Sequence, residues 1–130
     1  MKLLILDDQG PVGAIISRIA QQSGWQAFHT VSPDQIGQTI LKDGIDVLML
    51  DYLIESPESE INGLSILEKL RAAGVRIPAI LFTGWPDLVD RPKAKSLNVL
   101  GILEKPLSIQ ELRVILNDAK KQVLEQSSAG

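Results

Sequence analysis

The sequence contains no cysteine, which excludes disulfide bonds, zinc–thiolate sites and thiol chemistry from its 130 residues. It also lacks an apolar run long enough to cross a membrane, and Asp7 and Asp8 interrupt the first apolar run too early for a signal peptide. We therefore expect a cytoplasmic protein with no membrane partner. The net charge is −3 and the basic residues are scattered, so the clustered basic patch of a nucleic-acid-binding surface is missing.

Short apolar runs recur along the chain at regular intervals. They occupy residues 2–6, 46–50, 78–82 and 100–103, and a more mixed run spans residues 25–31. Continuous apolar runs of this length are typical of strands buried on both faces of a parallel sheet. The mixed composition of residues 25–31 indicates a strand at the edge of the sheet.

Segments of helical period separate these runs. Three of them end at Gly24, Gly44 and Gly74, and the last covers residues 109–123. Ser32 followed by Pro33 predicts an N-cap and the first position of the second helix. Ser108 and Glu111 have the spacing of a capping box before the last helix. Pro92 predicts that the fourth helix is short or irregular.

Five strand–helix units in strict alternation predict the fold class. The expected fold is an α/β domain with a mainly parallel sheet and helices on both of its faces. We place this single domain at residues 1–124 and expect a flexible tail at residues 125–130.

Polar residues stand where the predicted strands end. Asp7 and Asp8 follow the first run, Asp51 the third, Thr83 the fourth and Lys105 the fifth. Each has an ordinary explanation on its own, such as a helix cap, a turn residue or a surface lysine. Because the carboxyl ends of parallel strands meet at one rim of the sheet, their joint occurrence favours a functional site.

The chemistry of this set is consistent with phosphoryl transfer. Three carboxylates can share a cleft when a divalent cation lies among them, and Mg²⁺ prefers hard oxygen ligands. A carboxylate can also attack phosphorus and form an aspartyl phosphate. An ammonium group at Lys105 and a hydroxyl at Thr83 would then stabilise the phosphoryl oxygens.

These residues resemble the motifs of a known family. The matching stretches are LDD (6–8), Asp51 after VLML, FTG (82–84) and EKP (104–106), within a similarity that covers residues 2–123. Together they resemble the receiver domain of bacterial two-component response regulators. The resemblance implies a flavodoxin-like fold whose five-stranded parallel sheet has the order 2-1-3-4-5.

The resemblance also implies roles for the acidic residues. Asp51 would be the phosphoacceptor, which receives the phosphoryl group from a phosphohistidine on a sensor histidine kinase or a phosphotransfer protein. Asp7 and Asp8 would hold Mg²⁺ together with Asp51 and the backbone carbonyl of Leu53. The chain would then be a signalling domain that catalyses only its own phosphorylation and dephosphorylation.

The remaining implied roles concern the structural change that follows phosphorylation. Thr83 would bond to the phosphoryl group and move toward it, and Lys105 would pair with its oxygens through a turn that contains a cis Lys105–Pro106 bond. Phosphorylation would alter the face made by the fourth helix, the fifth strand and the fifth helix. A downstream output domain or protein would bind there, and a homodimer could form through the same face.

Two features depart from the family pattern. Ile102 stands three positions before the lysine, where the family usually has an aromatic residue, and the loop at residues 52–63 is longer than expected. A degenerate receiver that acts as a phosphorylation-independent interaction module therefore remains an alternative. A flavin- or nucleotide-binding protein is less consistent with Asp7 and Asp8, because their charges would repel a phosphate. A phosphatase with an aspartate nucleophile would need a different arrangement of acids.

Overall fold

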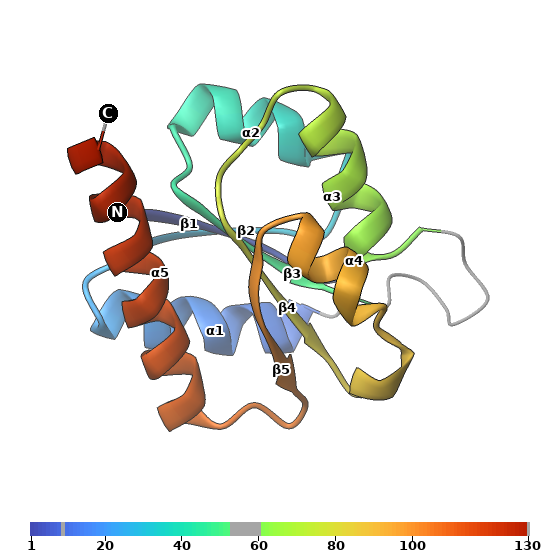
Figure 1. Ribbon diagram of the computed structural model, residues 1–130. Coiled ribbons are helices and arrows are strands. Elements are labelled where there is room, and N and C mark those ends of the chain that lie inside the picture. The colour runs from blue at the N-terminus through green and yellow to red at the C-terminus, as the bar shows by residue number, and fades with distance from the viewer. Residues whose placement is uncertain (9, 53–60, 130) are drawn as a thin grey trace.

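The computed structural model describes residues 1–8, 10–52 and 61–129 of the chain. A five-stranded parallel sheet runs through its centre with the strand order β2-β1-β3-β4-β5, as expected (Figure 1). The strands are β1 (Lys2–Leu6), β2 (Gln26–Thr30), β3 (Val47–Asp51), β4 (Ala79–Thr83) and β5 (Val99–Glu104). The predicted edge strand is therefore β2.

Helices cover both faces of this sheet. The α-helices are α1 (Gly10–Gln22), α2 (Ile36–Asp43), α3 (Gly63–Ala72), α4 (Arg91–Ser96) and α5 (Ile109–Ala129). Two short 3₁₀ helices, η1 (Pro33–Gln35) and η2 (Pro86–Leu88), precede α2 and α4. In Figure 1, α1 and α5 lie on one face of the sheet, whereas α2, α3 and α4 lie on the other.

Alternate residues of the strands build two separate cores. Leu3 and Ile5 pack with α1 and α5, whereas Leu4 and Leu6 pack on the opposite face with α2 and α3. All four side chains are at most 1% exposed. Burial on both faces explains why the strands are continuous apolar runs rather than alternating ones.

Glycine ends the helices at the predicted positions. Gly44 adopts a left-handed conformation, with φ of 68°, and its N–H donates to the carbonyl of Ile40 at the end of α2. Gly74, which follows α3, has a φ of 91°. Glycine adopts such positive φ angles without the steric cost that a side chain would impose.

Three helix boundaries differ from the expectations. Pro33 begins a 3₁₀ turn rather than α2, and the Ser32 side chain makes no capping hydrogen bond. The helix α4 is short, at six residues, as Pro92 predicted, but the proline lies in its first turn, because Asp90 caps this helix by accepting a hydrogen bond from the Lys93 N–H. The helix α5 continues to Ala129, past residue 123, where the predicted helical segment ends.

None of the described helices is long and apolar enough to cross a membrane.

Candidate functional site

The parallel register brings the predicted site residues to one rim of the sheet. Asp51 ends β3, Thr83 ends β4, and Lys105 follows the last residue of β5. Asp7 comes directly after β1, whose Leu6 lies beside Leu50 of β3. The Lys105 N–H donates to the Thr83 carbonyl at 2.8 Å, which extends the β4–β5 pairing by one residue at this rim.

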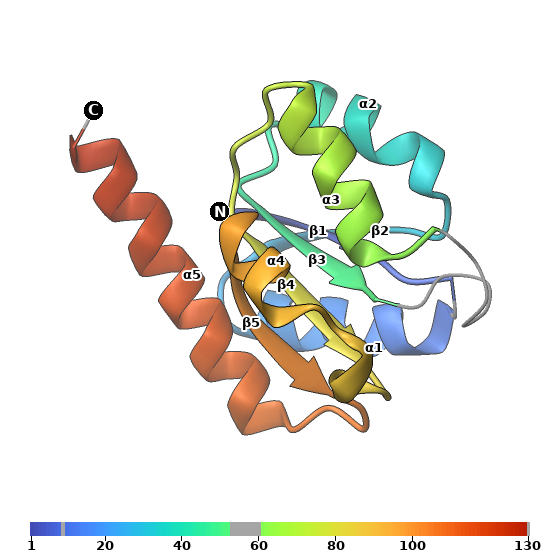
Figure 2. The ribbon, with the colours of Figure 1, turned by 45° about the vertical axis from the view of Figure 1, so that its right-hand side comes forward.

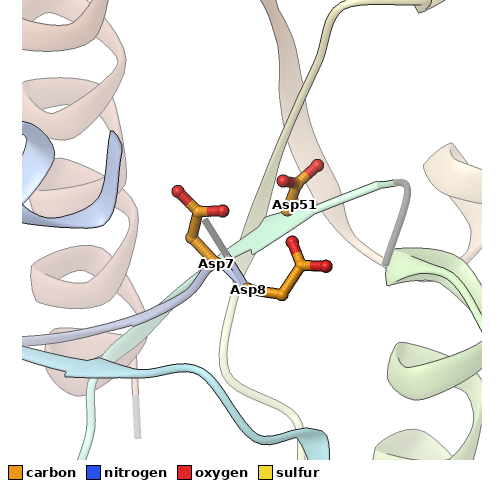
Figure 3. A group of neighbouring side chains, drawn as sticks. All are labelled: Asp7, Asp8 and Asp51. Atoms are coloured by element: carbon orange, nitrogen blue, oxygen red, sulfur yellow. The ribbon is translucent and has the colours of Figure 1, made fainter. Parts of the chain in front are cut away.

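Asp7, Asp8 and Asp51 form a compact acidic cluster. Each offers one carboxylate oxygen, and these oxygens all lie within 4.8 Å of one another. Figure 3 shows the three carboxylates gathered around the end of β3. Asp7 and Asp51 are buried, whereas Asp8 is exposed and opens the cluster to solvent.

The donor set of this cluster fits a hard divalent cation. Three carboxylate oxygens from two strand ends could coordinate Mg²⁺ while solvent supplies further ligands on the Asp8 side. A cation would also relieve the repulsion among three neighbouring carboxylates. The residues present therefore fit Mg²⁺.

Lys105 reaches into the same cluster from the end of β5. Its Nζ donates to Oδ2 of Asp51 at 2.9 Å and lies 5.1 Å from the centre of the Phe82 ring. Phe82 is fully buried, and the ammonium group of Lys105 lies over its ring. The Lys105–Pro106 peptide bond is cis, as the resemblance implied.

Burial dominates the electrostatics of Asp51. It raises the pKa of the Asp51 carboxyl from its usual 3.8 to about 6, and the neighbouring Asp7 contributes in the same direction. The hydrogen bond and the positive charge of Lys105 partly oppose this rise in pKa. Asp51 is therefore a buried carboxylate whose charge depends on a nearby cation.

Thr83 is buried beside this group, with 1% of its surface exposed. Its Oγ1 accepts a hydrogen bond from the Trp85 N–H at 3.0 Å, so the hydroxyl also stabilises the turn that follows β4. The ordinary explanation for this residue, a cap for the next segment, thus holds in the structure. The hydroxyl only accepts in this bond, so its own hydrogen could still be donated to a phosphoryl oxygen.

Comparison with known proteins identifies the family. Residues 3–117 match the family described as "Response regulator receiver domain". The chain belongs to this family. The receiver is 28% identical over 127 residues to Sporulation initiation phosphotransferase F of Bacillus subtilis, a match that covers 98% of this chain and 96% of the relative. It is 24% identical over 112 residues to Transcriptional regulatory protein TrcR of Mycobacterium tuberculosis, covering 86% of this chain and 42% of that protein.

Solved structures show the same fold at lower identity. The receiver domain of the Francisella response regulator 1452 has a TM-score of 0.79 at 21% identity and covers 93% of this chain and 97% of its own. A CheY-like receiver domain from Methanospirillum hungatei has a TM-score of 0.79 at 19% identity and covers 99% and 98%. NtrX from Brucella abortus has a TM-score of 0.84 at 16% identity, and the receiver spans 98% of this chain but 28% of NtrX. These likenesses confirm the flavodoxin-like receiver fold.

Part of the predicted metal site lies outside the described residues. Leu53, whose carbonyl the resemblance assigned to Mg²⁺, belongs to residues 53–60, which the structure does not describe. The chain returns from this loop close to the acceptor, since the Gly63 N–H donates to the Tyr52 carbonyl at 2.8 Å. A Cβ added at Gly63 would lie only 3.0 Å from the Asp51 carbonyl, so glycine permits this close approach.

Two residues near the receiver site were missed by the sequence analysis. The Nε2 of His29 lies 3.2 Å from the Asp7 carbonyl oxygen, because the His29 ring reaches from β2 over Gly13 of α1. Tyr52 is buried directly after Asp51, and its hydroxyl donates to the Leu88 carbonyl at 3.2 Å. A lone tyrosine after an apolar run carries no sequence signal of such a bond.

Proposed function

We propose that this receiver is a phosphoacceptor in a two-component phosphorelay. Asp51 receives a phosphoryl group from a phosphohistidine on a sensor histidine kinase or a phosphotransfer protein, in a reaction that requires Mg²⁺. The observation that carries this proposal is the position of Asp51, which is buried among two other carboxylates and hydrogen-bonded to Lys105 at 2.9 Å. The name of the B. subtilis relative, a phosphotransferase, supports the same chemistry.

The reaction forms one bond and breaks another. A carboxylate oxygen of Asp51 attacks the phosphorus, and the phosphorus–nitrogen bond of the partner's phosphohistidine breaks, with the electron pair going to the imidazole. Mg²⁺, held by Asp7, Asp8 and Asp51, supplies positive charge to the phosphoryl oxygens when it is bound. The carbonyl of Leu53 would be a further ligand.

Two side chains of the receiver stabilise the product. Lys105 exchanges its bond to Oδ2 of Asp51 for a bond to the oxygens of the incoming phosphoryl group. The Thr83 hydroxyl, whose oxygen accepts the Trp85 N–H, donates its own hydrogen to a phosphoryl oxygen. Both side chains lie at strand ends next to the acceptor, so small rotations can bring them to the new group.

The proposed output is a change at the face formed by α4, β5 and α5. Each state of this face has a different affinity for its partner, and phosphorylation shifts the population between the states. A downstream output domain or protein binds there, or a second copy of the chain. No contact with nucleic acid is assigned to this domain.

Intact-mass spectrometry with acetyl phosphate as the donor tests the proposal. In the presence of Mg²⁺, the wild-type chain should gain the mass of one phosphoryl group, and the Asp51→Asn variant should gain none. Asp87→Asn, which removes an exposed carboxylate of η2 outside the cluster, serves as the matched control and should react like wild type. A folded wild-type chain that gains no mass would favour the phosphorylation-independent receiver.

A further inference from the structure

Tyr52 connects the end of β3 to a distant segment of the chain. It directly follows Asp51, and its hydroxyl donates to the Leu88 carbonyl, 36 residues away, at 3.2 Å. The side chain is 9% exposed. The phenol therefore extends from the proposed acceptor toward η2, and this bond is shielded from competition with bulk water.

The backbone of Tyr52 is held on both sides. Its N–H donates to the Phe82 carbonyl of β4 at 3.0 Å, and its carbonyl accepts the Gly63 N–H at the start of α3 at 2.8 Å. The first bond continues the β3–β4 pairing at the end of β3, and the second ties Tyr52 to the start of α3. A shift of the Asp51 backbone therefore carries the ring of Tyr52 with it.

The other end of the link leads into α4. Leu88 is the last residue of η2, and the next two residues are the buried Val89 and Asp90, the N-cap of α4. Figure 2 shows this segment running from the end of β4 back into α4. Leu88 itself is 54% exposed. The segment is therefore attached to the protein by the bond from Tyr52 to the Leu88 carbonyl and by the burial of Val89.

The ring of Tyr52 also lies in the core beneath the proposed output face. It belongs to the same cluster of buried side chains as Val89, which follows η2, and Ala94 of α4, and Ile102 of β5 packs against this cluster. Ile102 is branched and aliphatic, so it has no ring that could rotate between buried and exposed positions. The described aromatic side chain that joins the Asp51 end of the sheet to α4 is Tyr52.

We propose that Tyr52 is a positioning residue that transmits the phosphorylation state of Asp51 to α4 through its hydrogen bond to Leu88. When Asp51 carries a phosphoryl group, the end of β3 and the Thr83 turn shift, and Tyr52 draws η2 and the N-cap of α4 along. This inference rests on the phosphoacceptor function proposed above. It assigns the coupling to a residue next to the acceptor rather than to position 102.

The test compares amide NMR shifts in two regions of the protein at saturating beryllofluoride and Mg²⁺, a mimic of the phosphoryl group. The first region is the site, reported by Thr83 and Lys105, and the second is α4 (Arg91–Ser96). Tyr52→Phe removes the hydroxyl and keeps the buried ring. It should show the wild-type shifts at the site but less than half of the wild-type shift changes in α4.

Three further variants test whether loss of the Tyr52 hydroxyl causes the smaller shift changes in α4. Tyr52→Leu also lacks the hydroxyl and keeps an apolar side chain in the core, so it should reproduce the loss. Leu88→Ala changes an exposed side chain but keeps the acceptor carbonyl, so it should respond like wild type. Thr39→Val is the matched control, because it removes a different bond from a hydroxyl to a backbone carbonyl, that to Gln35 next to α2.

Three other outcomes of this experiment would each overturn the coupling role of Tyr52. A full α4 response in both Tyr52 variants overturns the coupling role. Loss of the shifts at Thr83 and Lys105 in these variants also overturns it, because Tyr52 would then maintain the site itself. Absence of site shifts in the wild-type chain contradicts the phosphoacceptor function, and the coupling with it.

Discussion

Lys105 and Asp51 are 54 residues apart in the sequence, yet Lys105 Nζ donates to Asp51 Oδ2 at 2.9 Å. The Asp51 side chain is 3% exposed and that of Lys105 is 22% exposed, so the lysine covers the buried carboxylate from the solvent side. The pair joins the ends of β3 and β5 at the rim where the proposed chemistry occurs. Lys105 stabilises the charged form of Asp51, and in the proposed reaction it would stand where the phosphoryl oxygens arrive.

The first prediction concerns the ionisation of Asp51. In Mg²⁺-free protein, an NMR titration of its carboxyl carbon should give a midpoint near the pKa of about 6 that burial produces. Lys105→Ala removes the hydrogen bond and charge that lower this pKa, so the midpoint should move to higher pH. Lys95→Ala, an exposed lysine of α4, provides a control that should leave it unchanged. A wild-type midpoint near the usual 3.8 would contradict the buried environment described for Asp51.

The second prediction follows from the same pKa and concerns stability. The folded chain holds the Asp51 proton up to about pH 6, whereas the carboxyl of the unfolded chain releases it near its usual 3.8. The Asp51 carboxyl therefore lowers the free energy of unfolding as pH rises between these two values. Asp51→Asn abolishes this titration, so its stability relative to wild type should increase across that window, by at most about 3 kcal/mol.

Urea unfolding of both proteins in Mg²⁺-free buffer at several pH values measures this difference. Asp87→Asn provides the control for loss of an exposed carboxylate. A difference between wild type and Asp51→Asn that stays constant from pH 4 to pH 7, or that decreases, would show that the Asp51 carboxyl is not destabilised by burial.

The third prediction concerns the metal. Mg²⁺ should raise the melting temperature of wild type, because a cation that binds only the folded chain stabilises it by about 1.4 kcal/mol at ten times its Kd. Asp8→Asn should raise the melting temperature of the metal-free protein, since it removes one charge from the acidic cluster. The same variant should lose the Mg²⁺-induced shift. If Asp8→Asn keeps the full shift while Asp87→Asn behaves like wild type, Mg²⁺ does not bind at this cluster.

The fourth prediction concerns the movement of Thr83. Its Oγ1 accepts the Trp85 N–H at 3.0 Å, so a movement of Thr83 toward a phosphoryl group changes the bond that holds the backbone of a tryptophan that is 58% exposed. In a Trp25→Phe background, which removes the buried second tryptophan, beryllofluoride should change the emission of Trp85. Adding Thr83→Ala should abolish most of that change without preventing beryllofluoride binding. An undiminished emission change in the Thr83→Ala protein would exclude the hydroxyl as its cause.

The sheet and the acidic cluster could be predicted because their signals are local. Each strand is buried on both faces, so it appears as an apolar run whose last residue marks the rim of the sheet. Once the strands are known to be parallel, their ends must converge, and the positions of Asp51, Thr83 and Lys105 follow. The same reasoning placed Asp7 and Asp8 beside Asp51, as the structure shows.

The features that were missed depend on contacts between distant segments or on competing caps. Pro92 correctly predicted a short fourth helix, but not its start: Asp90, two residues earlier, caps α4, and the proline occupies a first-turn position that needs no N–H. The bond from Tyr52 to Leu88 joins residues 36 positions apart, and no local sequence pattern around either residue predicts it. The position of His29 depends on the packing of β2 over Gly13 of α1, which no periodic pattern encodes.

The central claim is that Asp51 forms the acyl phosphate, and chemical trapping tests it most directly. Borohydride reduces an aspartyl phosphate to homoserine, so peptide sequencing by mass spectrometry identifies the modified position after reaction with acetyl phosphate and Mg²⁺. Tryptic cleavage after Lys42 and Lys69 places Asp43, Asp46 and Asp51 on one peptide, so the two other aspartates are internal controls. The account predicts homoserine at position 51 alone. Homoserine at position 43 or 46, or an unmodified Asp51 in a chain that has gained a phosphoryl group, would contradict it.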